Sequence, residues 1–238
     1  MRNIITIARR EFSSYFTSPL AYFVIPVFLG LVGFFSQYFD DFFASEVASL
    51  KSVFTWCAFF QLLLIPALTM RLFAEERRTG SIELLATMPI TESQMVLGKF
   101  LAAMGLVTVS LVLTLTYPLT LSELTDLETG PLVGGYLGLF LLAASFTAIG
   151  TAASAMTKNQ VVAFVTALLL CLIPFAMGFA LGRVPADVLP LVQYLSFKTH
   201  FTNLARGVID SRDVIYYLTT VALFLHIAVF SLERRRLS

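Results

Sequence analysis

Long apolar runs without any charge alternate with short polar segments along the chain. Six such runs contain no Asp, Glu, Lys or Arg, and each has at least 19 residues: 12–39, 52–70, 100–122, 129–157, 159–182 and 214–232. A helix that crosses a bilayer needs about 20 predominantly apolar residues. The pattern predicts six transmembrane helices, at 20–39, 53–73, 97–121, 132–156, 160–182 and 214–232.

The spans are expected to be helices and not strands of a membrane barrel. Barrel strands have about 10 residues and alternate apolar with polar side chains. The stretch LGLFLLAASFTAIGTAASAM at 137–156 does not alternate, and its small residues favour close packing against other helices. The predicted fold class is therefore an all-α polytopic membrane protein, a single transmembrane domain over 1–238.

Two amphipathic segments lie outside the predicted spans. Residues 3–17 place apolar side chains on one arc of a helix and Arg9, Arg10, Ser13 and Ser14 on the other, which is typical of a helix in the membrane interface. That apolar arc consists of Ile4, Ile5, Ala8, Phe12, Tyr15 and Phe16. Residues 187–209 repeat aromatic and aliphatic side chains at helical spacing, which predicts an outer helical segment with His200 at the interface.

Composition agrees with a membrane protein and excludes several other classes. Hydrophobic residues make up 58% of the 238, charged residues only 13%, and the mean hydropathy is +0.84, whereas soluble domains have about 25% charged residues. A net charge of +1 does not suggest a nucleic-acid partner. Cys57 and Cys171 fall inside spans and are interpreted as small buried hydrophobes, without disulfide or metal-ligand spacing.

The distribution of Lys and Arg predicts the orientation. With the N-terminus in the cytoplasm, eleven of the 16 fall on the cytoplasmic side and five on the outer side. Cytoplasmic loops carry an excess of these residues. Both termini are therefore expected in the cytoplasm, and the segment after the second span is expected to be the first cytoplasmic loop.

The sequence lacks the groups that a self-powered transporter or an enzyme would need. Ion-coupled carriers use ionisable side chains inside the membrane, and the six runs contain only the isolated His226. No phosphate-binding loop of the G-x-x-x-x-G-K-[ST] type is present. We therefore expect no catalytic residue, metal or cofactor in this chain, and an external source of energy.

The polar stretch FAEERRTGSIELLATMPI at 73–90 interrupts the apolar pattern. Gly80 permits a sharp bend, Ser81 is a suitable N-cap, Glu83 suits the first turn of a helix, and Pro89 ends it. The segment predicts a short helix that offers Leu84 and Leu85 to a groove on a partner. Charged pairs would fix its orientation, through Glu76, Arg77 and Arg78. The alternative is a solvated loop with an incidental charge cluster.

These residues resemble a known family. The run from Glu76 through Gly80 to Leu85, closing at Pro89, resembles the E-x-x-x-G-T-x-E-x-L signature of ABC-2-type permeases, with Ser81 in place of threonine. The stretches REFSSYFTSPLAYFVIPVF, VLGKF and RGVIDSRDVIYYL are similar to the gliding-motility (GldF-like) branch of that family.

The resemblance implies the membrane subunit of a bacterial inner-membrane ABC exporter. The 75–89 loop would hold the coupling helix that docks on a separate ATPase subunit, which itself binds ATP and magnesium and drives alternating access. That interface would comprise Glu76, Arg77, Arg78, Gly80, Ser81, Glu83, Leu84, Leu85 and Pro89. Residues 3–17 would form the elbow helix, with Arg9, Arg10, Glu11 and Phe12.

Further partners are implied by the same resemblance. The permease would pair with a second copy or a homologous permease, and an auxiliary protein with an extracytoplasmic domain would be a possible companion. Two other functions remain open: an ATP-driven mechanical or assembly subunit of a surface or motility complex that moves no substrate, and a stand-alone secondary carrier. The sequence does not identify a transported substrate.

Overall fold

A computed structural model describes residues 2–38, 50–80, 90–123 and 128–236, and within these ranges every regular element is a helix. The elements are α1 (Arg2–Thr17), α2 (Leu20–Tyr38), α3 (Leu50–Thr69), α4 (Arg71–Thr79), α6 (Glu92–Leu113), α7 (Thr116–Ser122), α8 (Thr129–Met156), α9 (Gln160–Ala180), the 3₁₀ turn η1 (Leu181–Arg183), α10 (Leu189–Leu195), α11 (Phe197–Ala205) and α12 (Ser211–Arg236).

Six helical stretches in the described residues are long and apolar enough to cross a membrane, which confirms the predicted all-α fold class. They are Leu20–Tyr38, Leu50–Thr79, Glu92–Ser122, Thr129–Met156, Gln160–Arg183 and Ser211–Arg234. The second stretch extends beyond the residues expected for the span, because α4 continues it after a one-residue break at Met70. Residues 75–79, which the sequence assigned to the following loop, are therefore helical.

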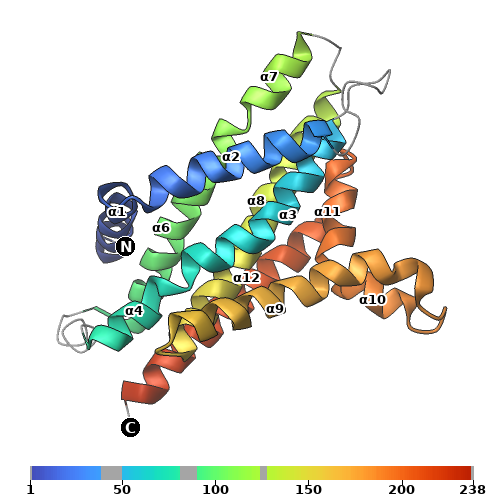
Figure 1. The fold of residues 1–238 in the computed structure, drawn as a ribbon. Coiled ribbons are helices and arrows are strands. Elements are labelled where there is room, and N and C mark those ends of the chain that lie inside the picture. Colours follow the sequence, from blue (N-terminus) through green and yellow to red (C-terminus); the bar gives the residue numbers. More distant parts are fainter. Residues whose placement is uncertain (1, 39–49, 81–89, 124–127, 237–238) are drawn as a thin grey trace.

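Helix α8 lies at the centre of the bundle, with α3, α6, α9 and α12 packed around it (Figure 1). All residues from Leu141 to Ala155 are buried. Glycines allow this approach: a Cβ at Gly135 would clash with the ring of Phe54, and one at Gly150 with the side chain of Thr69. Packing through small residues is what the composition of this span predicted.

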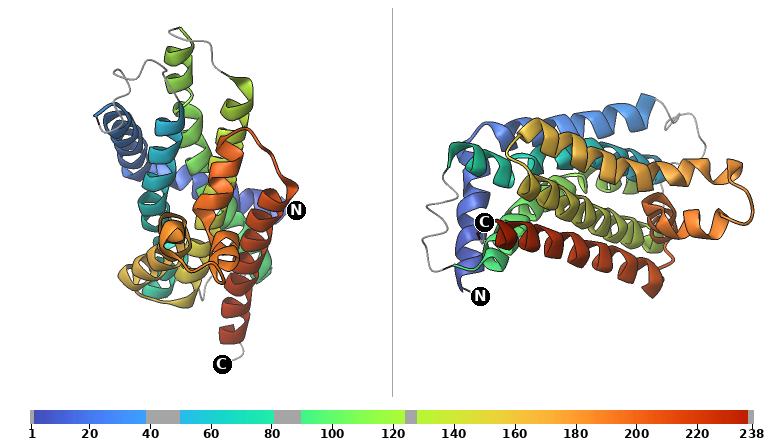
Figure 2. Two further views of the ribbon diagram at one scale, coloured as in Figure 1. Left: turned by 90° about the vertical axis from the view of Figure 1, so that its right-hand side faces the viewer. Right: turned by 90° about the horizontal axis from the view of Figure 1, so that it is seen from below.

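Helix α1 crosses the bundle instead of running along it, as the right-hand view of Figure 2 shows. It packs on α6 at two glycines seven residues apart. A Cβ at Gly98 would lie 2.7 Å from Ile7 Cγ2, and one at Gly105 would lie 3.0 Å from the ring of Phe12. The apolar arc expected from the sequence is therefore shifted, because Ile7 contacts α6 while Ile5 is 65% exposed.

The two ends of the bundle differ in their elements. Helices α1, α4 and the C-terminal end of α12 lie together at one end, and α7, α10 and α11 lie toward the other (Figures 1 and 2). We call these the α1/α4 end and the α10/α11 end. The outward faces of α2, α9 and α12 carry large exposed apolar side chains, such as Phe23, Leu169 and Leu223, as hydrocarbon contact requires.

Candidate functional site

The junction between α3 and α4 is fixed by a serine from the central helix. Ser154 Oγ donates to the carbonyl of Met70 at 2.8 Å and accepts from the backbone N–H groups of Phe73 at 3.0 Å and Ala74 at 3.1 Å. The first N–H groups of a helix have no partner within it. One hydroxyl therefore both caps α4 and attaches it to α8.

Arg77 attaches the middle of α4 to the end of α8. The guanidinium is buried, and its Nη1 donates to the carbonyl of Ala155. Ser231 from α12 donates to the same oxygen at 3.3 Å. The last carbonyls of a helix lack intrahelical donors and carry the negative end of its dipole, so a cation is favourable there. The Ala155 carbonyl thus joins α8 to Arg77 on α4 and to Ser231 on α12.

A lysine between two carboxylates lies at the same end of the molecule. Lys99 on α6 is only 2% exposed. Its Nζ lies 2.8 Å from Glu76 Oε1 on α4 and 3.3 Å from Glu11 Oε1 on α1. The ammonium also lies 5.3 Å from the centre of the Phe73 ring, within range of a cation–π contact. We call Glu11, Glu76 and Lys99 the Lys99 cluster.

The Lys99 cluster joins helices that are far apart in the sequence. Glu11 and Lys99 are 88 positions apart, and Glu76 and Lys99 are 23 apart. A buried ammonium is tolerated only where carboxylates and hydrogen bonds replace water. With one cation and two anions, the cluster carries a formal charge of −1. Its geometry requires α1, α4 and α6 to keep their relative positions.

Neighbouring groups reinforce the contact between α1 and α6. Asn3 Nδ2 donates to Gln94 Oε1 at 3.2 Å, and the rings of Phe12 and Phe16 lie 5.2 Å apart. Burial, together with the Glu11 carboxylate one turn earlier, raises the pKa of the Tyr15 hydroxyl above its ordinary value. Arg9 and Arg10, by contrast, are exposed on the other side of α1.

The sequence matches the family described as ABC-2 family transporter protein over residues 17–232. The chain belongs to this family. No curated protein matches it. The family assignment makes the chain a permease component of an ABC transporter and a multi-pass membrane protein.

The expected interface residues of this ABC-2 permease differ in where the structure places them. Glu76 and Arg77 make the internal contacts described above, and Arg78 is exposed. Gly80 ends α4 with φ at +75°, a left-handed conformation that favours glycine. The remaining residues, Ser81, Glu83, Leu84, Leu85 and Pro89, lie outside the described residues.

Sequence reasoning missed Lys99 because a lysine near the cytoplasmic end of a span is ordinarily counted as a solvent-exposed charge. A signal was present: Lys99 is the only charged residue between Glu92 and Glu123, and it follows Gly98, on which α1 packs. The carboxylates that pair with it are on two other helices, which a single sequence does not place.

A second buried pair lies at the α10/α11 end of the permease. The side chain of His200 is only 7% exposed and packs inside the protein, a burial that the sequence did not predict. Its Nδ1 lies 2.6 Å from Asp213 Oδ1, its Nε2 lies 2.9 Å from the carbonyl of Tyr194, and its ring stacks on Tyr216 at 4.0 Å. Each ring nitrogen thus lies within hydrogen-bond distance of an oxygen atom. We call Tyr194, His200, Asp213 and Tyr216 the His200 cluster.

The other candidate ligands are dispersed. Within the described ranges, no group of three or more His, Cys, Asp or Glu side chains is arranged to hold a metal ion. Cys57 and Cys171 are buried and not bonded to each other, and His226 lies on an exposed face of α12.

Proposed function

We propose that this chain is the permease subunit of an ABC exporter that is moved by a separate ATPase docked on the loop after α4. The observation that carries the proposal is the attachment of α4 to the rest of the bundle. Ser154 and Arg77 connect it to α8, and Lys99 connects it to α1 and α6. A force applied just beyond Gly80 would reach four helices through these contacts.

The residues of the proposed interface then divide by role. Gly80 sets the direction of the chain as it leaves α4, because only glycine adopts φ of +75° without strain. Ser81 and Glu83 would start the coupling helix, and Leu84, Leu85 and Pro89 would provide apolar docking. Arg78, which is exposed, would contact the ATPase. Glu76 and Arg77 would act on the permease side, as the attachment of α4.

The complete transporter would contain further chains. ATP and magnesium would bind to the ATPase subunit, whose closure would push on 81–89 and shift the permease between inward- and outward-facing states. A second permease copy would complete the pathway. We place the chain in the gliding-motility (GldF-like) branch, with an auxiliary extracytoplasmic protein as a further partner. The eleven Lys and Arg counted on one side support cytoplasmic termini in a bacterial inner membrane.

The test is copurification of the tagged chain from its native membranes in mild detergent. We expect an ATPase with a phosphate-binding loop to copurify with the wild type and to be lost with Glu83→Arg. The matched control is Glu128→Arg, which reverses an exposed carboxylate before α8 and should retain the partner.

Three outcomes are informative. Loss of the ATPase in Glu83→Arg alone supports the docking site. Purification of the chain without any ATPase, with both variants behaving as the wild type, would overturn the proposal and favour a stand-alone carrier. A retained ATPase without substrate movement in proteoliposomes would instead favour a mechanical or assembly subunit.

A further inference from the structure

A lysine at the α10/α11 end has no carboxylate partner. Lys198 is the second residue of α11, and its ammonium lies 3.1 Å from the centre of the Phe179 ring on α9. Within the described ranges, Lys198 takes part in no salt bridge. A cation–π contact occupies one side of an ammonium, which carries three donors. The other donors of Lys198 are therefore open to a group from outside the described fold.

The side chain of Lys198 is held in place by its neighbours. A Cβ at Gly178 would lie 2.6 Å from Lys198 Cβ, so the stem of the lysine packs directly on α9. The side chain of Ser196 caps the start of α11. Tyr217 Oη on α12 donates to the carbonyl of Phe197 at 2.8 Å. These contacts fix the first turn of α11, so the ammonium is positioned before any ligand binds.

The ammonium lies at the level of the lipid head groups. Phe179, which the ammonium contacts, comes 19 residues after Gln160, the first residue of α9. This separation corresponds to about 28 Å along a helix axis, and the hydrocarbon core of a bilayer is about 30 Å thick. Because α9 starts at one surface of the membrane, its end near Phe179 reaches the polar region of the other surface.

Exposed apolar side chains surround Lys198. The Phe179 ring is 62% exposed, and neither η1 nor α10 has a buried residue. Figure 1 shows these two elements projecting from the bundle beyond the end of α9. Their exposed apolar side chains include Leu191, Tyr194 and Leu195. This surface continues the outward apolar face of α9, so the bilayer that covers α9 also reaches α10.

The same region has an excess of positive charge. Residues 181–209 contain Arg183, Lys198 and Arg206 but only one carboxylate, that of Asp187, which gives a formal charge of +2 with the histidine counted as neutral. Partial burial lowers the pKa of the Lys198 ammonium, because the charged form loses hydration. An anion next to the ammonium would replace the lost hydration with a charge-assisted hydrogen bond.

We propose that this surface binds a phospholipid from the leaflet at the α10/α11 end, with the lipid phosphate on the Lys198 ammonium and the acyl chains along α9 and α10. Phosphate oxygens accept strong hydrogen bonds from an ammonium. A lysine stem can lie along apolar surface while its charge reaches the head groups. The exposed rings of Phe179 and Tyr194 lie where aromatic side chains are enriched, at the boundary between acyl chains and head groups.

A second permease copy fits this surface less well. In a two-fold symmetric contact the same patch of both chains meets, so each Lys198 would face another surface with a formal charge of +2. Like charges repel more strongly at a membrane boundary than in water, because the effective dielectric constant is lower. A phospholipid brings the opposite charge. The site lies within one chain and does not depend on the proposed ATPase.

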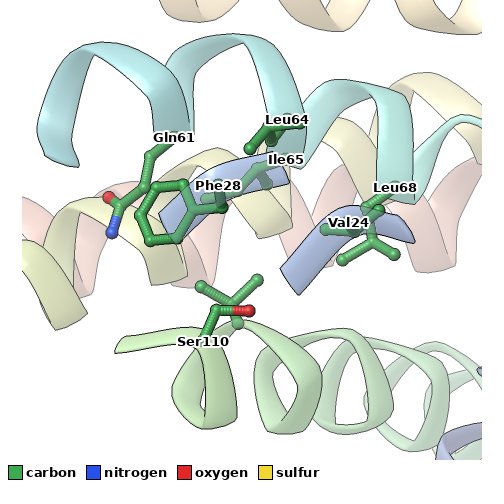
Figure 3. A pocket seen from close by; sticks show the side chains of 8 residues that line it. Val24, Phe28, Gln61, Leu64, Ile65, Leu68 and Ser110 are labelled. Carbon is green, nitrogen blue, oxygen red and sulfur yellow. The ribbon is translucent and has the colours of Figure 1, made fainter. Parts of the chain in front are cut away.

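A pocket inside the bundle does not compete with this surface as a lipid site. The pocket lies between α2, α3 and α6 and has a volume of ≈ 20 Å³, which is room for about one water molecule (Figure 3). It is lined by Val24, Phe28, Gln61, Leu64, Ile65, Leu68, Val107 and Ser110. An acyl chain does not fit there, whereas the surface of α9 and α10 is open to the bilayer.

The first test is native mass spectrometry of the purified full-length chain, titrated with phosphatidylglycerol in detergent. We expect one lipid to bind more tightly than the others. Lys198→Gln should weaken the binding of that lipid by about tenfold, because a charge-assisted hydrogen bond is lost. Lys198→Arg keeps the charge and should retain the lipid. The matched control is Lys158→Gln, which changes an exposed lysine between α8 and α9 and should leave the titration unchanged.

A second test asks what covers α10. Leu191→Trp combined with Trp56→Phe places a single tryptophan on the exposed surface of α10, since Trp56 is the only tryptophan of the chain. In nanodiscs, phospholipids brominated along their acyl chains should quench its fluorescence relative to nanodiscs of unbrominated lipid. This measurement does not require Lys198 to be altered, so it tests the lipid contact separately from the phosphate.

The opposing outcomes are distinct. Equal lipid affinity in the wild type and Lys198→Gln, or an equal loss in Lys158→Gln, would overturn the phosphate site. Displacement of the lipid by inorganic phosphate would assign Lys198 to a free anion instead. Absence of quenching, together with a dimer in the mass spectrum, would show that a second copy covers α10. Because no ATPase is present, each of these failures leaves the proposed docking site untouched.

Discussion

The Lys99 cluster and the His200 cluster place buried charges at opposite ends of the bundle, but they join different kinds of neighbours. The first connects residues up to 88 positions apart, on three helices. The second connects residues within 194–216, on α10, α11 and α12. Loss of the first would separate α1 and α4 from α6, whereas loss of the second would loosen one local segment.

The two basic side chains also differ in the hydrogen bonds that they can make. A lysine ammonium has three donors and no acceptor, whereas a neutral imidazole has one donor and one acceptor. Lys99 should therefore depend strongly on its two carboxylates, while His200 should tolerate a neutral polar partner in place of Asp213.

The largest effect is expected for Lys99→Met, which leaves Glu11 and Glu76 facing each other without a cation. Removal of one member of a buried ion pair typically costs about 3–5 kcal/mol. We expect a large loss of stability in thermal unfolding of the purified permease. We also expect less cross-linking of α1 to α6 by a short bifunctional thiol reagent between Cys variants of Asn3 and Gln94, whose side chains are hydrogen-bonded across these helices. The control is Glu11→Gln/Glu76→Gln/Lys99→Met, which should recover part of the loss.

A stability loss in Lys99→Met no larger than that of an exposed lysine, for which Lys158→Met serves, would contradict the comparison. The Lys99 cluster would then be only a surface ion pair, worth about 0–1 kcal/mol.

An intermediate effect is expected for Ser154→Ala. The substitution leaves the N–H groups of Phe73 and Ala74 and the carbonyl of Met70 without this partner, and a buried unsatisfied group costs about 1–3 kcal/mol. Thr151→Val is the matched control, since the Thr151 hydroxyl donates at 2.7 Å only within its own helix. Thermal unfolding should separate the two variants; equal stability would show that water replaces Ser154.

The smallest effect is expected for Asp213→Asn. An asparagine amide can donate to Nδ1 of a neutral imidazole, whose Nε2–H still donates to the carbonyl of Tyr194, so we expect a loss of about 1 kcal/mol or less. Asp213→Leu removes the partner altogether and should cost more. Both are measured by thermal unfolding. A loss of stability in Asp213→Asn as large as that in Lys99→Met would show that both clusters depend equally on a charged partner.

Much of the fold follows from the sequence because it depends on composition along one helix at a time. The uncharged runs predicted the six spans, and the small residues of 137–156 predicted that α8 packs closely against other helices. The contacts of the candidate site depend instead on which helices meet. In the sequence, Glu11, Glu76 and Lys99 each look like ordinary charges near the end of a span, and nothing indicates that Asp213 contacts His200. The break at Met70 is set by Ser154, 84 residues later.

The orientation of α1 also depends on the helix that it contacts. Its polar face was predicted correctly, with Arg9 and Arg10 exposed. Its apolar face differs from the predicted one at a single position: Ile7 packs into the recess at Gly98 while Ile5 is exposed, and Phe12 packs at Gly105 as a member of the predicted face. An interfacial helix faces a featureless lipid surface, whereas a packed helix turns to fit its partner.

The packing of α1 on α6 also determines when α1 can reach its native position during synthesis. Glu11 leaves the ribosome 88 residues before Lys99, and at about 5–20 residues per second this takes roughly 4–18 s. During that interval the surface that receives α1 does not yet exist. The amphipathic α1 can bind the bilayer surface through its apolar face until the part of α6 that contains Gly98 and Gly105 has been synthesised. The N-terminal helix is made first but reaches its native position only after the third span is in the membrane.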